Sequence, residues 1–334
     1  YRFDHHQVQE VLYDELLPDL REAYHASLAE SLVRRYAAEG HPERLEGRAV
    51  AEVCRHLLEG GRGEEAKRFI DDALDFLGAV YLHDEAVALA DSALSTPGML
   101  ADDERARVLL RAAETLHLLG RHEDESRLLD EAVRLSLDVG DRSLRVQALV
   151  GRGRWLQRAA SYGEATRVLD EARALARAVG DAAGERTVER VLGAVAYAQG
   201  DFDAAREHYG RQRELARAQG DPLEEAHATG NLGTALDRLG KHEDALACFQ
   251  HHLEVAEAEG DLVGQSVANG NLGVCLSDLG RYDDATTCFE RQLDLARRTG
   301  NREGEARATG YLAFVDVMHG RTELALERFR REAG

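Results

Sequence analysis

The chain has little proline, few aromatic residues and no long apolar run. Only 4 of its 334 residues are proline and 6% are aromatic, whereas sheets are rich in aromatic and β-branched side chains. This scarcity, together with abundant Ala, Leu, Arg and Glu, predicts helices. No stretch approaches about 18 consecutive apolar residues, so the sequence predicts no transmembrane helix and no membrane partner.

Cysteine is also scarce. The four cysteines, Cys54, Cys248, Cys275 and Cys288, are dispersed and form no CxxC pair, so a disulfide framework is not expected. Thiols of this kind are usually small buried side chains in a reducing compartment. We therefore expect a cytoplasmic protein. The sequence begins inside what reads as a structured segment, and we expect it to be part of a longer chain.

Positive charge is in deficit. The sequence has 42 Lys and Arg against 62 Asp and Glu, a net charge of −20. Binding to a phosphate backbone requires a positively charged surface. Nucleic acid and anionic membranes are therefore disfavoured as partners.

What the sequence does have is a repeat of 40 residues. Four series of residues share this spacing over its C-terminal two-thirds. They are Gly140, Gly180, Gly220, Gly260 and Gly300, each followed by Asp or Asn; Gly120, Ala160, Gly200, Gly240, Gly280 and Gly320; Ala165, Ala205, Ala245, Ala285 and Ala325, with Glu125 departing; and Leu129, Leu169, Tyr209, Phe249, Phe289 and Phe329. Four series in one register indicate a repeat architecture.

Each repeat is predicted to be two amphipathic helices. In residues 221–240 the apolar positions follow spacings of three and four, as a helix with one buried face requires. Gly240 is predicted to end that helix, and a second helix is predicted to begin near His242. Asp221 followed by Pro222 has the order of an N-cap and first helical residue. One such hairpin cannot bury its own apolar face, so neighbouring hairpins are expected to stack.

These motifs resemble the tetratricopeptide repeat family. The resemblance depends on Asn231, Gly233, Ala245 and Phe249 in one copy and on Asn271, Gly273, Ala285 and Phe289 in the next. The unit is longer than the usual length of about 34 residues and resembles the 40-residue variant. The resemblance implies an all-α, right-handed superhelical solenoid over residues 103–334. It would contain about six repeats, starting at residues 103, 143, 183, 223, 263 and 303, with the last one truncated.

The N-terminal third is less regular. Residues 44–95 have the pattern of irregular helical hairpins of the same kind, and Ser95–Gly98 reads as a loop within the array. Residues 1–36 resemble the segment that joins the ATPase to the helical repeats in bacterial signal-transducing NTPases with numerous domains. That resemblance implies a short winged-helix-like remnant, with a strand at residues 1–3, and an ATPase domain upstream in the native chain.

The sequence carries no recognisable catalytic or cofactor motif. It has no GxxxxGK[ST] phosphate loop, no GxSxG and no HExxH. The pairs His5-His6 and His251-His252 have no further ligands at metal spacing. We therefore expect no enzyme activity, no cofactor and no metal site.

The remaining candidate is a partner-binding surface. In the resembling family the first helix of each hairpin lines a concave groove that holds peptides. The groove positions by that resemblance include Arg154, Arg158, Arg190, Tyr197, Thr234 and Arg238, which we call the arginine strip. Guanidinium groups there would suit carboxylates of an acidic protein or peptide. The alternative is that these arginines pair with neighbouring acids of the same chain.

Three hypotheses about function follow. The first is a non-enzymatic sensor or scaffold arm of a multidomain signalling ATPase that binds a protein or peptide in the groove. The second is a regulatory domain with a small-molecule inducer pocket, for which an enclosed apolar cavity would be evidence. The third is a self-association surface that assembles a homo-oligomer.

Overall fold

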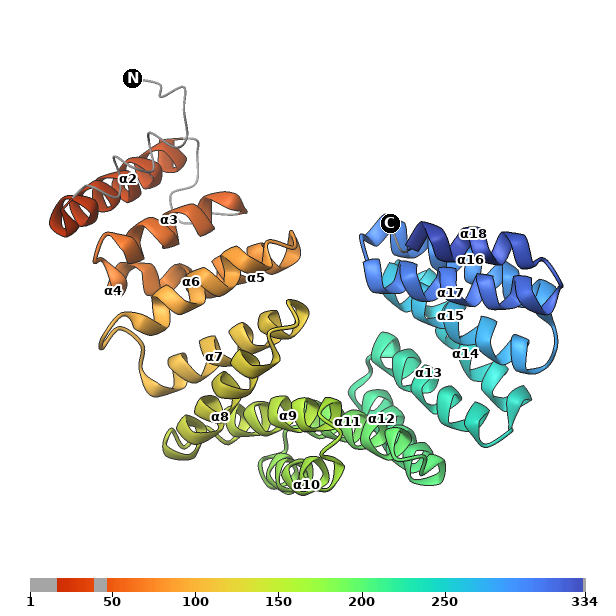
Figure 1. Cartoon of the computed structure of the whole chain (residues 1–334). Coiled ribbons are helices and arrows are strands. Elements are labelled where there is room, and N and C mark those ends of the chain that lie inside the picture. Colours follow the sequence, from red (N-terminus) through yellow and green to blue (C-terminus); the bar gives the residue numbers. More distant parts are fainter. Residues whose placement is uncertain (1–16, 39–46, 333–334) are drawn as a thin grey trace. The chain divides into compact units, whose positions relative to one another are not determined.

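The computed structural model describes residues 17–38 and 47–332, and helices are the only regular secondary structure in those ranges (Figure 1). The predicted all-α class built from repeated hairpins is therefore confirmed. The chain divides into two compact units, residues 1–152 and 153–334. The predicted strand at residues 1–3 lies outside the described residues.

The first unit combines short and long helices. They are α2 (Pro18–Ala38), α3 (Arg48–Glu59), α4 (Gly63–Ala66), a 3₁₀ turn (Lys67–Phe69), α5 (Ile70–Ala79), α6 (His83–Ser95), α7 (Asp102–Leu118), α8 (His122–Asp138) and the first part of α9 (Arg142–Arg158). The core of α3 to α6 contains fully buried Val53, Cys54 and Ala90. Leu109 and Ala132 begin a second core between α7 and α8.

The second unit is a series of paired helices of nearly equal length. After the end of α9 come α10 (Tyr162–Val179), α11 (Ala182–Ala198), α12 (Phe202–Gln219), α13 (Pro222–Arg238), α14 (His242–Ala258), α15 (Leu262–Asp278), α16 (Tyr282–Thr299), α17 (Arg302–Met318) and α18 (Thr322–Glu332). Each helix from α10 to α18 packs against the next one along the chain. The 40-residue rhythm is thus a helix pair, as predicted.

Glycine ends the helices in a left-handed conformation. Gly220 and Gly240 have φ values of +68° and +75°, and the other members of both glycine series do the same. A residue with a Cβ is disfavoured in this region. Ala160 is the exception, since it adopts a φ of +55° at a position where the other repeats have glycine.

Asp and Asn cap the first helix of each pair, as predicted. Asp181 accepts from the backbone N–H of Gly184 at 2.8 Å, and Asp221 accepts from that of Glu224 at 3.0 Å. Asp261 accepts from Val263 at 3.1 Å. Each of these bonds satisfies one of the free N–H groups at the start of a helix.

Small residues on one helix receive a large side chain from its partner. A Cβ added to Gly233 would lie 2.7 Å from the ring of Phe249, and one added to Gly273 would lie 2.4 Å from the ring of Phe289. Ala245 and Ala285 are fully buried beside these rings. The glycines therefore allow each hairpin to close around an aromatic ring.

Candidate functional site

The arginine strip lies on three helices of the second unit. Arg154 and Arg158 are on the last part of α9, Arg190 and Tyr197 on α11, and Thr234 and Arg238 on α13. Arg154, Arg190, Tyr197 and Thr234 are half-buried, whereas Arg158 and Arg238 are exposed. The hydroxyl of Thr234 donates to the carbonyl of Asn231 in its own helix at 2.7 Å.

Arg190 is a half-buried guanidinium without a carboxylate partner. Burial lowers its pKa, and the nearby charge of Glu224 and the phenol of Tyr209 only partly oppose that shift. Within the described residues Arg190 forms no ion pair. An arginine held partly out of water binds an anion more strongly than an exposed one, because less water competes for its donors.

The arginines around it are paired. Arg186, one turn earlier on α11, faces Asp221 and Glu224 at 3.6 and 3.5 Å. Arg217 pairs with Glu225 at 2.5 Å. The alternative from the sequence, that the strip pairs internally, therefore does not describe Arg190.

Aromatic rings connect Arg190 to Arg238. The ring of Tyr209 is buried against Gly193, and burial raises its pKa to about 12, with Tyr197 and Arg190 as its charged or polar neighbours. The ring of Tyr197 meets that of Phe202 edge to face at 5.3 Å, and the guanidinium of Arg238 lies 5.4 Å from the centre of the Phe202 ring. Arg238 forms no ion pair with any described residue.

Tyr197 stays protonated at neutral pH. Burial raises its pKa, Arg238 opposes the shift, and Asp237 and Tyr311 add to it. The phenol therefore remains a hydrogen-bond donor as well as an acceptor. Two guanidinium groups without an ion-pair partner among the described residues, together with this phenol, are chemically suited to a carboxylate-bearing partner.

A buried acid beside the strip, Asp237, already has a partner. The carboxylate of Asp237 is 2.8 Å from Nδ1 of His242. Cys275 lies close by, and burial raises the pKa of its thiol, with Asp237 adding to the effect. Asp237 thus interacts with His242.

The two repeated asparagines have different surroundings. Nδ2 of Asn231 donates to Oε1 of Gln212 at 3.2 Å. This partner is a side chain of the preceding hairpin. Asn271 occupies the same register and is half-buried.

A polar series in the second helices was missed from the sequence. Gln212, His252 and Gln292 are spaced by 40 residues and are only 1–3% exposed. His252 lies against Gly230, and Gln292 lies against Gly270. Both ring nitrogens of His252 lack a hydrogen-bond partner among the described residues. The sequence could have revealed this series, because its residues recur with the same 40-residue spacing as the apolar series.

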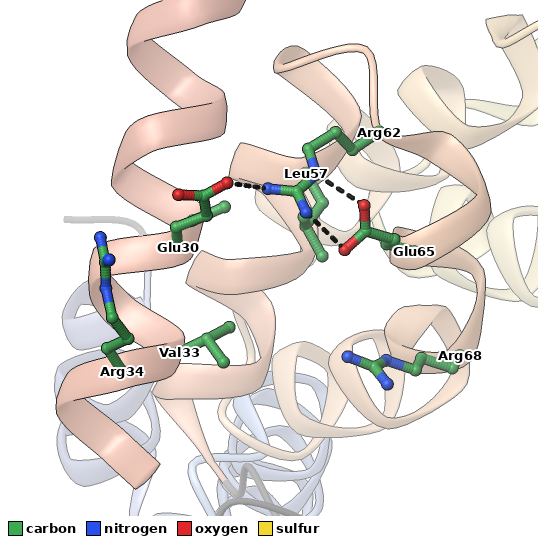
Figure 2. A pocket seen from close by; sticks show the side chains of 8 residues that line it. Glu30, Val33, Arg34, Leu57, Arg62, Glu65 and Arg68 are labelled. Carbon is green, nitrogen blue, oxygen red and sulfur yellow. Dashed lines mark hydrogen bonds and ion pairs between the residues drawn. The ribbon is translucent and has the colours of Figure 1, made fainter. Parts of the chain in front are cut away.

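The first unit contains an open pocket of about 290 Å³ between α2, α3 and α4 (Figure 2). The guanidinium of Arg62 bonds Glu30 at 2.9 Å and Glu65 at 2.6 Å across it. The remaining lining residues are Ala29, Val33, Arg34, Leu57 and Arg68. Five of its eight lining residues are charged and the pocket is open, whereas an inducer pocket requires an enclosed apolar cavity.

Three groups of side chains have metal-ligating atoms within 4.8 Å of one another. They are His25, His56 and Glu59; His117, His122 and Glu125; and Asp237, His242 and Cys275. None of them was found from the sequence, because each group combines residues from two or three helices. Glu125 is the residue that replaces alanine in the repeat, and it is almost fully buried.

No helix in the described ranges combines the length and the apolar character needed to cross a bilayer. The alternating helices, left-handed glycines and ring-to-glycine contacts define a helical-hairpin repeat protein. The chain belongs to the tetratricopeptide repeat family, which matches residues 144–211, 184–258 and 265–332, together more than half of the sequence. The resemblance seen in the sequence is confirmed. The copy predicted at residues 103–142 precedes these matches and corresponds to α7 and α8.

Solved structures share this fold at low sequence identity. A signal-transduction ATPase with numerous domains from Pyrococcus horikoshii, which has a tetratricopeptide repeat sensor, is 14% identical with a TM-score of 0.63 over 94% of this chain. The chain spans only 46% of that protein's length. No curated protein matches the chain by sequence.

Two further structures match over most of their own length. A Rap protein complexed with competence and sporulation factor is 14% identical, with a TM-score of 0.64 over 94% of this chain and 97% of its own. Aspartyl phosphate phosphatase F from Bacillus subtilis is 12% identical, with a TM-score of 0.64 over 98% of this chain and 86% of its own. The tetratricopeptide repeat fold of this chain is typical of protein–protein interaction.

Proposed function

We propose that the chain is a non-enzymatic, peptide- or protein-binding sensor arm of a multidomain signalling ATPase that acts in the cytoplasm. Its partner is an acidic segment held by Arg190, Tyr197 and Arg238. The observation that carries the proposal is the half-buried Arg190 and the Arg238 that lies over the Phe202 ring, neither of which forms an ion pair with a described residue, in a chain of net charge −20.

The likeness in fold to a tetratricopeptide repeat sensor and to a Rap protein complexed with competence and sporulation factor supports the sensor part. The ATPase part rests on the same archaeal structure and on the resemblance of residues 1–36. In this proposal an ATPase domain belongs to the same native chain, and partner binding changes its activity.

The binding test begins with short random peptides selected on the immobilised chain. Selected peptides should be enriched in Asp and Glu. Their Kd, measured by fluorescence anisotropy, should rise about 100-fold or more when Arg190→Gln and Arg238→Gln are combined, since each hydrogen bond to a charged group contributes about 1.5–3 kcal/mol. Binding should also weaken with added salt.

The matched control is Arg298→Gln. Arg298 is exposed and pairs within its helix with Asp294 at 3.6 Å, so its loss removes the same charge without touching the strip. Selected peptides without an acidic excess, or an unchanged Kd in the double variant, would contradict the proposal. The parent class is tested by the full reading frame, where a GxxxxGK[ST] loop is expected. A frame without one would remove the ATPase part alone.

A further inference from the structure

Helix α2 packs on α3 in the first unit (Figure 1). Two histidines and a glutamate meet at this contact. Nδ1 of His25 is 2.7 Å from Nδ1 of His56 and 3.0 Å from Oε2 of Glu59. Nδ1 of His56 is 3.8 Å from the same carboxylate oxygen. The two rings stack at 4.9 Å, and both histidines are largely shielded from water.

The packing of the two helices brings these atoms together. His56 and Glu59 are three residues apart on α3, so they lie on one face of it. Just beyond, Gly60 lets the end of α3 approach α2 closely, since a Cβ there would lie 2.6 Å from the backbone nitrogen of Ala26. Ala29 on α2 and Leu57 on α3 fix the contact from the core side.

One proton cannot satisfy all three atoms. A neutral imidazole has a single N–H, so a hydrogen on Nδ1 of His25 would have to serve both His56 and Glu59. Nδ1 of His56 and Oε2 of Glu59 would then face each other as two acceptors. A metal ion between the three atoms would remove this conflict, because it accepts a lone pair from each imidazole nitrogen and from the carboxylate.

We propose that His25, His56 and Glu59 form a binding site for a divalent transition-metal ion, with Zn²⁺ as the best fit, that joins α2 to α3. Two imidazoles and one carboxylate are a ligand set that zinc accepts, with water in the fourth position. Calcium and magnesium prefer oxygen ligands alone.

The separations fit this assignment. In a tetrahedral zinc site with bonds of about 2.0–2.1 Å, ligand atoms stand about 3.4 Å apart. The observed separations of 2.7, 3.0 and 3.8 Å lie on both sides of that value, so small side-chain rotations would place all three ligands.

The test uses Co²⁺ as a spectroscopic substitute for zinc. The metal-free chain should bind one equivalent of Co²⁺ with the visible d–d bands of a four-coordinate site, and Zn²⁺ should abolish them. His56→Gln and Glu59→Gln should each weaken binding about 100-fold or more, because even a residue that only supports a ligand costs about 10- to 100-fold. His251→Gln, which removes an exposed histidine, should leave binding unchanged.

A second readout keeps the test decisive if one variant folds poorly. Glu59 is 38% exposed, so Glu59→Gln is expected to fold. Zn²⁺ should raise the thermal midpoint of the unmodified chain, and a chelator should reverse the rise, whereas Glu59→Gln should show neither effect. The proposal is overturned if no d–d bands appear. It is equally overturned if both variants keep the Co²⁺ spectrum and affinity of the unmodified chain, since the metal would then be bound elsewhere.

Discussion

The two units solve the same packing problem in different ways. In the second unit every hairpin from α11 to α16 closes by placing a ring against glycine, as Phe289 does against Gly273. In the first unit the helices between α3 and α6 vary from 4 to 13 residues. There, each close contact involves its own pair of residues and does not recur at a fixed spacing. An example is Gly63, which lies against the sulfur of Met99.

The difference teaches where regularity is useful for prediction. In a repeat, the same residue type recurs at a fixed spacing, and each recurrence supports the structural role inferred for a glycine or an aromatic residue. The first unit offers a single instance of each contact. Its unusual features, including the His25–His56 contact at 2.7 Å, become visible only in three dimensions.

The largest expected effect tests the closure of the regular hairpins. Phe289→Ala should destabilise the second unit by about 3–5 kcal/mol, because it removes a fully buried ring and leaves a cavity. Hydrogen exchange should show lost protection first in α15 to α17. The control is Phe314→Ala, which changes a half-exposed phenylalanine and should cost less than about 0.5 kcal/mol. Equal losses in the two variants would contradict ring-to-glycine closure.

A smaller effect concerns the buried polar series of the second unit. Burial lowers the pKa of His252 to about 4, with the neighbouring His227 adding to the shift. Because the folded pKa lies below the unfolded value of about 6.5, protonation favours the unfolded chain. The free energy of unfolding is therefore highest above pH 6.5, where His252 is neutral in both states, and it decreases as the pH falls toward 4. Between pH 7 and pH 5 this contributes a loss of about 2 kcal/mol.

His252→Gln should remove that loss, because glutamine does not titrate and already occupies this register at Gln212 and Gln292. Urea unfolding at the two pH values measures it. His251→Gln, at an exposed neighbour, should retain the acid sensitivity of the unmodified chain. If His252→Gln loses as much stability on acidification as the unmodified chain, His252 is not the group responsible.

The smallest expected effect concerns one turn position of the repeat, which is occupied by Gly120 in the first unit and by Ala160 in the second. Ala160→Gly should stabilise the chain by about 0.5–1 kcal/mol, because glycine relieves the left-handed strain of Ala160, although its freedom in the unfolded chain offsets part of the gain. Gly120→Ala, forty residues earlier with a φ of +69°, should destabilise by about 1 kcal/mol. Thermal unfolding with the same sign for both changes would show that the two turns are not equivalent.

Much of the fold could be predicted because local rules determine it. Helix α13 ends two residues before Gly240, and α14 begins at His242, as the sequence indicated. These boundaries depend on caps and turns within a few residues. The left-handed Ala160 could also be anticipated, because it belongs to a glycine series.

The candidate sites were less predictable because they depend on what is absent or distant. The strip residues could be identified from their repeat positions. The sequence could not show which of the arginines lack an ion-pair partner, because pairing depends on contacts between helices, such as that of Glu224 on α13 with Arg186 on α11 at 3.5 Å. His25 and His56 are 31 residues apart on two helices. No spacing rule connects them, because their contact depends on how α2 packs on α3.

The turns at Gly260-Asp261 and Gly300-Asn301 have the same backbone form and the same capping role. A genetic crossover between them would delete or duplicate the hairpin of α15 and α16 and still leave an intact junction. The forty-residue unit is therefore also a natural unit of gene rearrangement. A lineage can lengthen or shorten this array one hairpin at a time without first passing through a misfolded intermediate sequence.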